Sequence, residues 1–435
     1  MRKAVWYTIA AVGCGGMVGS VSIARSSDRS GPALRSVPSE ARIRDLDIEF
    51  YRGRVQRDPR SAGDYTQLAG LYLQRGREGA VNADLLQAEQ NARRSLHLRS
   101  GRNAAAFGVL ASTLLAQHRF VEALQVSHRL LAFDSASISA RGLLGETQLE
   151  LGQYKEARRT LGALATYSGD LSVAPRLARW HELHGRPEQA RRLLRVARAE
   201  AQRRHGMPKE HLAWFHLRLG DLALRHGHLG EAERELRDGL GVSPNDYRLL
   251  GTVARLDAVR HRWPSAIAYG ERAIASALDP ATLGVVGDAY HAVGDTAKAE
   301  EYYHTMEVTV LHQTGPFHRA WSLFLLDHDR QVPQVLAKVR EELRTRTDIY
   351  GYDLLAWALH KSGRHREAGA AMAHALALGT RDAMLFYHAG MIERALGDNA
   401  AAQAHLQAAL DANPYWSPLQ PEHARRVLDS IRTRP

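Results

Sequence analysis

A small residue recurs along this 435-residue chain at steps of 33 to 35 residues, apart from two steps of 42. The positions are Ala69, Ala111, Gly145, Ala178, Gly220, Ala254, Gly287, Ser322, Ala356 and Gly390. Twelve residues after each of the last nine comes a second position, which is Ala in every unit but one: Ala123, Ala157, Ala190, Ala232, Ala266, Ala299, Gln334, Ala368 and Ala402. In the first unit Ala88 takes this role, seven residues late. A period of this length indicates an array of similar supersecondary units.

Each pair of small residues predicts two antiparallel helices that cross closely, because helix axes can approach only where the side chains between them are small. Seven residues after the first small residue most units carry a glycine, and the others carry His or Asp: Gly76, His118, Gly152, Gly185, Gly227, His261, Gly294, Asp329, Gly363 and Gly397. Gly readily adopts the left-handed conformation that ends a helix. We therefore expect a helix–helix turn at each glycine, at least eighteen helices between residues 45 and 432, and no sheet.

The ten units resemble the tetratricopeptide repeat over about residues 45–416. The resemblance implies an all-α, right-handed superhelical solenoid with terminal capping helices. It also implies a non-enzymatic scaffold that binds an extended peptide or a partner protein in a concave groove lined by the first helix of each unit. The spacing itself predicts only the fold, and a fold does not determine a function.

The chain divides into five segments. We expect a signal peptide or anchor at 1–24, a flexible linker at 25–44, an N-terminal capping helix at 45–60, the repeat array at 61–416, and a C-terminal capping helix and tail at 417–435. The two long steps predict a longer turn around residues 77–87 and a helix over 188–204 that is extended by about two turns. Unit eight, about residues 315–348, departs most from the pattern.

The first 24 residues have a basic start, an apolar run from Ala4 to about Ile23 and a small-residue ending. This order is typical of a secretory signal peptide. Two alternatives remain open. Ala11–Cys14 resembles a bacterial lipoprotein box, which would attach a lipid at Cys14, and the apolar run is also just long enough for a retained membrane anchor. All three place the body of the protein outside the cytoplasm, in the periplasm or cell envelope.

The sequence lacks the common catalytic, metal-binding and phosphate-binding motifs. The sequence has no His-Glu-x-x-His, no phosphate-binding Gly-rich loop and no Gly-x-Ser-x-Gly, and its one cysteine is Cys14. The net charge of +11 is dispersed without interleaved aromatic residues, so we expect no nucleic-acid partner. We predict no enzymatic activity and no cofactor. An alternative function is an accessory metal- or small-ligand-binding component of an envelope system, using the pairs His181/His184, His226/His228 and His360/His365.

The resemblance also implies which side chains line the groove, namely those at the second, fifth, ninth and twelfth positions of each first helix. The candidates of the partner-binding groove are Trp214, Asp221, Arg248, Arg255, Arg319, Tyr350, Asp353, Trp357, His360, Tyr387, Met391 and Arg394. Aromatic and Arg side chains are the usual anchors of interfaces. Alternatively, Trp357 and Tyr387 pack between neighbouring units. The Lys/Asn pattern of members that bind chaperone tails is missing, so a carboxylate clamp is not expected.

Overall fold

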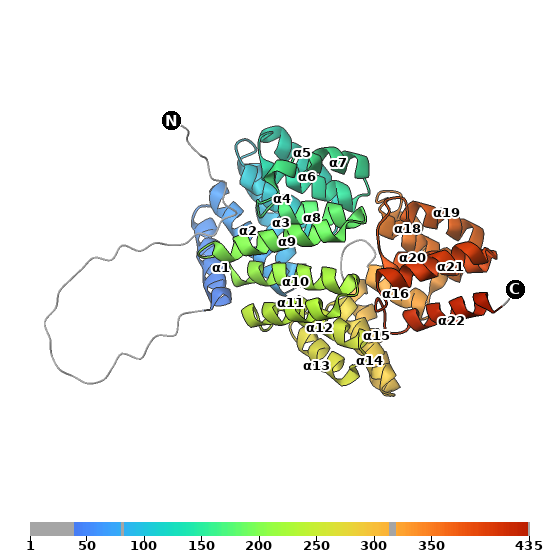
Figure 1. The fold of residues 1–435 in the computed structure, drawn as a ribbon. Helices are drawn as coiled ribbons and strands as arrows, with labels where there is room; N and C mark the ends of the chain where they lie inside the picture. Colours follow the sequence, from blue (N-terminus) through green and yellow to red (C-terminus); the bar gives the residue numbers. More distant parts are fainter. Residues whose placement is uncertain (1–38, 80–81, 313–318, 434–435) are drawn as a thin grey trace, which may run out of the picture.

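The computed structural model describes residues 39–79, 82–312 and 319–433. Within these ranges the chain forms 22 α-helices and one 3-10 helix, and no strand (Figure 1). The all-α prediction is therefore confirmed. The proposed leader, including Cys14, lies outside the described residues, as does most of the proposed linker. None of the described helices is long and apolar enough to span a bilayer.

The helices alternate between the first and second helix of each unit. The first helices are α2 (Ala62–Gly79), α4 (Ala104–Ala116), α6 (Ile138–Glu150), α8 (Ala174–Leu183), α10 (Lys209–Arg225), α12 (Tyr247–Val259), α14 (Pro280–Ala292), α16 (Arg319–Asp327), α18 (Ile349–Lys361) and α20 (Ala383–Leu396). The second helices are α3 (Asn82–Leu98), α5 (Phe120–Phe133), α7 (Tyr154–Gly162), α9 (Pro187–Arg203), α11 (Leu229–Val242), α13 (Trp263–Ile274), α15 (Thr296–His312), α17 (Val332–Glu342), α19 (His365–Ala375) and α21 (Asn399–Ala412). Helices α1 (Glu40–Arg57) and α22 (Gln420–Arg432) flank them, and the 3-10 helix Ala165–Tyr167 follows α7.

The turn inside each unit is left-handed at nine of the ten expected positions. The six glycines from Gly152 onward have φ between 68° and 90°, and His118, His261 and Asp329 have φ of 57°, 58° and 53°. Gly76 is the exception, and the prediction that it lies at a turn is wrong. It lies inside α2, where a Cβ would meet Leu85 at 2.8 Å, so this glycine allows a close approach between α2 and α3.

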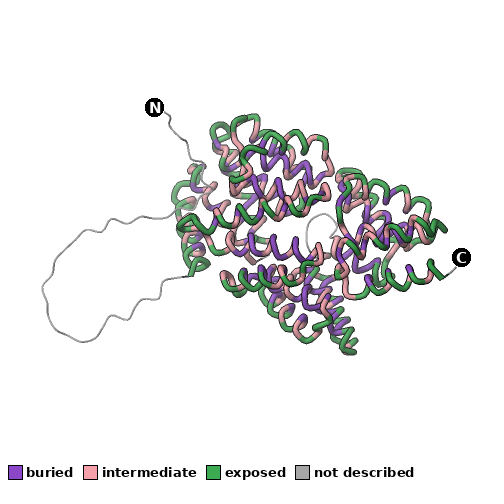
Figure 2. The backbone as a smooth tube through the Cα atoms, in the orientation of Figure 1, coloured by how far each residue is buried: buried purple, intermediate pink, exposed green. Residues whose placement is uncertain are grey.

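The small residues lie where the helices of a unit cross. A Cβ added to Gly145 would meet Leu161 at 2.5 Å, and one added to Gly390 would meet Leu406 at 2.7 Å. Ala157, Ala368 and Ala402 on the second helices are completely buried. Figure 2 shows that buried residues gather where neighbouring helices face one another. The crossing pattern thus builds a continuous core along the array.

Unit eight has a shifted register. Its turn contains one extra residue, Gln331, which adopts a left-handed conformation (φ 47°) directly before α17. Gln334 is consequently exposed, and Val335 is the completely buried residue at the crossing. The inserted residue explains why Ala is missing at the expected position.

The sequence places several boundaries differently from the structure. Helix α1 begins at Glu40, inside the expected linker, because the Ser39 hydroxyl caps it by accepting from the Arg42 N–H (3.2 Å). Residues 77–79 and 82–87 are helical, so the longer turn around 77–87 is wrong. The long helix expected over 188–204 is present as α9, at Pro187–Arg203, but it does not take up the whole of the long step, because α10 is lengthened as well and each helix has 17 residues.

Candidate functional site

Charged side chains of the first helices of units four to six meet on the inner side of the array. Two carboxylates, Glu182 of α8 and Asp221 of α10, are surrounded by four guanidinium groups. The Arg179 group lies 3.1 Å from Glu182, and the Arg225 group bridges the two carboxylates, with its Nε 3.0 Å from Asp221. We call these residues, together with Arg218 and Arg255, the inner charged cluster.

The four arginines do not share the two carboxylates equally. Arg255 of α12 pairs directly with Asp221, whereas Arg218 reaches Glu182 and Asp221 only at 3.9 and 3.8 Å. Four cations against two anions leave the cluster with an excess of positive charge. The guanidinium of Arg218 is therefore the least compensated member.

The pKa values of the cluster follow from burial and from these neighbours. Burial alone would raise the pKa of Glu182, but Arg225, Arg179 and Arg218 lower it to about 2. The pKa of Asp221 is likewise held well below its usual range by Arg225, Arg255 and Arg218, against the effect of burial. Burial lowers the pKa of Arg218, and its carboxylate neighbours do not fully offset this. Both carboxylates remain ionised at neutral pH.

Arg77 of α2 adds a further uncompensated charge. Arg77 is exposed, and no ion pair between it and a carboxylate is found among the described residues. Burial lowers the pKa of Arg77, as do the neighbouring cations of Arg176 and Arg248, while Glu210 and Glu146 act in the opposite direction.

Tyr350 joins the inner charged cluster to the C-terminal units. The guanidinium of Arg179 lies 5.5 Å from the centre of its ring, and that of Arg319 of α16 lies 4.9 Å from it. Burial raises the pKa of Tyr350 to about 12. Arg319 also pairs with Asp353 (2.8 Å), whose other oxygen lies 2.7 Å from Nδ1 of His388. Asp353 and His388 are completely buried, so this second group holds α16, α18 and α20 together.

The predicted groove residues fall into two sets. Asp221, Arg248, Arg255, Arg319 and Tyr350 are partly exposed and take part in, or lie beside, the charged contacts described above. The remaining residues either pack in the interior or lie apart from the cluster: Trp214, Asp353, Trp357, His360, Tyr387, Met391 and Arg394.

Trp357 and Tyr387 are each 4% exposed and lie between neighbouring units, as in the alternative left open by the sequence. The Trp357 ring stacks on His388 at 4.1 Å and on His360 at 5.0 Å. Trp214 packs against Phe215 on α10, and Arg394 donates to Asn399 (2.5 Å). These residues therefore contribute packing between helices in the conformation that the structure describes.

Four members of the inner charged cluster are not among the predicted residues. Arg179 and Glu182 occupy the ninth and twelfth positions of unit four, so the same positional rule, applied one unit earlier, would have named them. Arg218 and Arg225 follow the fifth and twelfth positions of unit five by one residue. That offset is set by the rotation of α10 about its axis, which the repeat pattern does not specify.

The histidine pairs have no further metal-ligating partners. His184 lies against Trp180, with ring centres 3.7 Å apart, and the rings of His360 and His365 are 5.1 Å apart. Burial lowers the pKa of His226 and of His360 to about 4. No group of three or more His, Cys, Asp or Glu within the described ranges could hold a metal ion.

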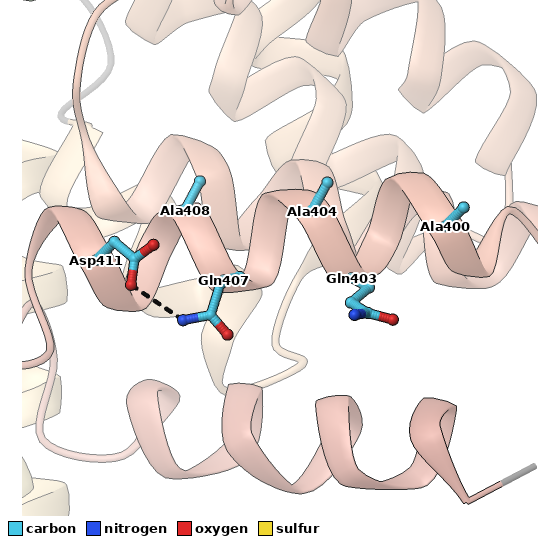
Figure 3. Close-up of a pocket in the computed structure, with 6 residues that line it drawn as sticks. All are labelled: Ala400, Gln403, Ala404, Gln407, Ala408 and Asp411. Carbon is cyan, nitrogen blue, oxygen red and sulfur yellow. Dashed lines mark hydrogen bonds between the residues drawn. The ribbon is translucent and has the colours of Figure 1, made fainter.

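A shallow groove lies along the outer side of α21. Figure 3 shows its lining, which consists of Ala400, Gln403, Ala404, Gln407, Ala408 and Asp411, with Gln407 donating to Asp411 (3.0 Å). Its walls come from one helix and carry a single charge. This groove therefore has no arrangement of groups that indicates a ligand.

Comparisons with known proteins agree with the architecture. Models of the tetratricopeptide repeat match residues 114–170 and 385–415, so the chain contains tetratricopeptide repeats. The 22 α-helices of the described residues form a solenoid of such units, a fold that is typical of protein–protein interaction scaffolds and generally not of enzymes. A comparison with curated proteins finds no significant match.

Several solved structures are similar along most of their length. The crystal structure of the APC/C hetero-tetramer Cut9–Hcn1 is 14% identical, with 90% of this chain and 93% of that chain covered and a TM-score of 0.35. A human IFIT1 dimer with PPP-AAAA is 14% identical, with coverage of 86% and 95% and a TM-score of 0.44. Yeast Tom70 is 11% identical, with coverage of 91% and 94% and a TM-score of 0.37. Similarity at this level carries no inference about what this chain binds.

Proposed function

We propose that this protein is an interaction scaffold whose inner side binds an extended, acidic segment of a partner protein. The observation that carries the proposal is the excess of positive charge in the inner charged cluster, where four guanidinium groups share two carboxylates, together with the exposed Arg77 on another first helix. Carboxylates pair well with guanidinium groups, and such charge-assisted hydrogen bonds are the strong ones. An acidic segment would supply carboxylates to Arg77 and would add closer partners to Arg218, whose own carboxylate neighbours lie at 3.8 and 3.9 Å.

An extended segment suits the repeat architecture better than a compact ligand. Arg77, Arg218 and Arg255 are carried by the first helices of three different units. Groups spaced along an array in this way contact successive residues of an extended chain. The paired cluster members Glu182 and Asp221 would then fix the direction of that chain by repelling carboxylates at their own positions.

Affinity for model peptides tests this proposal. We expect an oligoglutamate peptide to bind the protein and an oligolysine peptide of equal length not to bind. Arg218→Ala and Arg77→Ala should each weaken oligoglutamate binding about tenfold, because a hydrogen bond to a charged group contributes about 1.5–3 kcal/mol.

Arg159→Ala is the matched control. Arg159 lies on α7, is 77% exposed and pairs only with Glu156 of its own helix (3.0 Å), so its removal should leave the affinity unchanged. Equal binding of both peptides, or equal affinities of all three variants, would contradict an acidic segment on the inner side.

We also propose that the protein is exported to the cell envelope, on the basis of the basic, apolar and small-residue order of residues 1–24. A reporter fused after Ser39 should be active outside the cytoplasm. If a lipid is attached at Cys14, Cys14→Ser abolishes lipid labelling and membrane retention. A reporter that is active only in the cytoplasm would refute export.

A further inference from the structure

The turns inside units three, four and five each contact a non-helical segment of the C-terminal units. These three segments lie before α18, before α20 and after α21. On one side are the C-terminal ends of α6, α8 and α10, at Leu151, Leu183 and Leu224. On the other side are Thr347, Thr380 and Asn413, which follow one another at intervals of 33 residues. We call these three contacts the seam. In Figure 1 the seam lies where the orange and red helices approach the green ones.

Each contact of the seam caps a helix end. The last carbonyl groups of an α-helix have no partner within the helix. The Thr347 N–H donates to the Leu151 carbonyl (3.1 Å), and the Thr380 hydroxyl donates to the Leu183 carbonyl. The side-chain amide of Asn413 donates to the carbonyls of Leu224 (3.0 Å) and Arg225 (3.1 Å). At each of the three contacts, a donor from the C-terminal units thus bonds to a carbonyl group at the end of a helix.

The turn glycines distinguish the seam from the other turns. A Cβ on Gly152 would overlap the backbone of Thr347, one on Gly185 would overlap the Gly379 carbonyl, and one on Gly227 would lie 2.9 Å from the Asn413 side chain. At Gly294, Gly363 and Gly397, which also have positive φ, a Cβ would meet nothing within 4 Å. Glycine is therefore required at the seam both for its conformation and for the close approach.

The contacts of the seam are local. Its two sides meet through turns and helix ends, and among the described helices no α6, α8 or α10 packs lengthwise on α18, α20 or α22. The path between the two sides runs through unit eight, whose helices have only 9 and 11 residues and pack on each other over a short length. Buried apolar residues of both sides, among them Leu149 and Ile349, belong to one core, so opening must separate some apolar contacts. Because no helices pack lengthwise across the seam, opening still exposes less apolar surface than the unfolding of a unit would.

We infer that the seam is a clasp that opens as one unit and controls access to the inner charged cluster. Arg179 and Arg225 of the cluster lie next to it, and Tyr350 of the opposite side covers Arg179. Opening separates Tyr350 from Arg179 while the helices on both sides stay folded. The inference rests on the proposed function only for the identity of the ligand, which is an acidic segment. The clasp itself is a property of the fold.

Amide hydrogen exchange on the full-length chain tests the clasp. Asn413→Asp replaces a donor by an acceptor of the same size and places a carboxylate against two carbonyl oxygens. The N–H groups of Thr347 and Ile349 are the reporters, because they bond across the seam to Leu151 and to the Tyr154 hydroxyl (2.9 Å). We expect their exchange to accelerate about tenfold or more, as the loss of one buried hydrogen bond implies.

Two further variants complete the test: one is a control outside the seam, and the other removes a second contact of the seam. Asn399→Asp is the matched control, because Asn399 accepts from Arg394 on the outer side and a carboxylate can do the same, so exchange at the reporters should not change. Thr380→Val removes the middle bond without changing the size of the side chain and should act like Asn413→Asp. If both seam variants accelerate exchange only at their own neighbours, the three contacts are independent and the clasp is refuted.

The rate of oligoglutamate association separates the clasp from the proposed function. If the seam controls access, Asn413→Asp increases the association rate several-fold along with the exchange rate. Faster exchange with oligoglutamate binding at an unchanged rate would overturn the control of access. Faster exchange when neither the parent nor the variant binds oligoglutamate would support the clasp and refute the acidic ligand.

Discussion

At the scale of single residues, Trp357 illustrates how one side chain can serve packing or binding. It occupies the ninth position of its helix, which the family resemblance assigns to the groove. The structure places it at 4% exposure, stacked on His388 and donating from its indole N–H to Asp327 (3.0 Å). The fully buried His388 on the neighbouring α20 is what turns this ring inward. A positional rule cannot anticipate a partner that lies 31 residues further along the chain.

The first prediction concerns this residue. Trp357→Ala should lower the free energy of unfolding by about 3–5 kcal/mol, because it leaves a cavity between α18 and α20. Trp357→Phe keeps the ring stack and should cost less. Melting temperature and oligoglutamate affinity are measured on the same sample. An unchanged melting temperature combined with weaker binding would show that Trp357 contacts the ligand.

At the scale of helices, the small residues at the crossings are read correctly from the sequence wherever the unit has its usual length. Ala368 is completely buried between α18 and α19. Gln334 holds the equivalent position in unit eight but is exposed, because the additional residue Gln331 rotates α17 by one position. The spacing between elements, rather than residue type alone, decides which residue enters the crossing.

This difference yields the second prediction. Ala368→Leu should destabilise the protein by about 1–3 kcal/mol through overpacking. Gln334→Leu, at the same repeat position, should change stability by less than about 0.5 kcal/mol, as is usual for surface substitutions. Thermal unfolding of the two variants checks both values. Equal losses would mean that α17 is not shifted in register.

At the scale of the whole molecule, three titratable groups that are buried or half-buried predict how stability depends on pH. His226 and His360 have pKa values of about 4 in the folded chain against 6.5 for a free imidazole, because burial disfavours their charged form. The unfolded chain therefore binds more protons between pH 6.5 and about 4, and stability falls as pH falls through this window. Glu182, with a folded pKa of about 2 against 4.5, adds a further loss as pH falls from 4.5 towards 2.

Unfolding by urea at a series of pH values measures this third prediction. His226→Gln and His360→Gln should each flatten the decline between pH 6.5 and about 4 without affecting the part below pH 4. Glu182→Gln should flatten only the part below pH 4.5. His405 serves as a contrast, because Glu393 raises its pKa above 6.5, so its contribution is complete below pH 6.5 and is lost at higher pH. A decline that all these variants share would contradict the assignment.

Outside units one and eight, the sequence by itself determined the local architecture: which segments are helices, where they turn and which small residues lie at each crossing. These features repeat every unit and depend on contacts between residues close in the chain, so a period is enough to reveal them. Only the tertiary structure decided how the array curves back to form the seam between Leu151 and Thr347, which are separated by 196 residues. Small rotations in each unit add up over five units, and no local pattern records their sum. The same curvature brings Tyr350 of unit nine to Arg179 of unit four, beside an inner charged cluster that neighbouring units form among themselves.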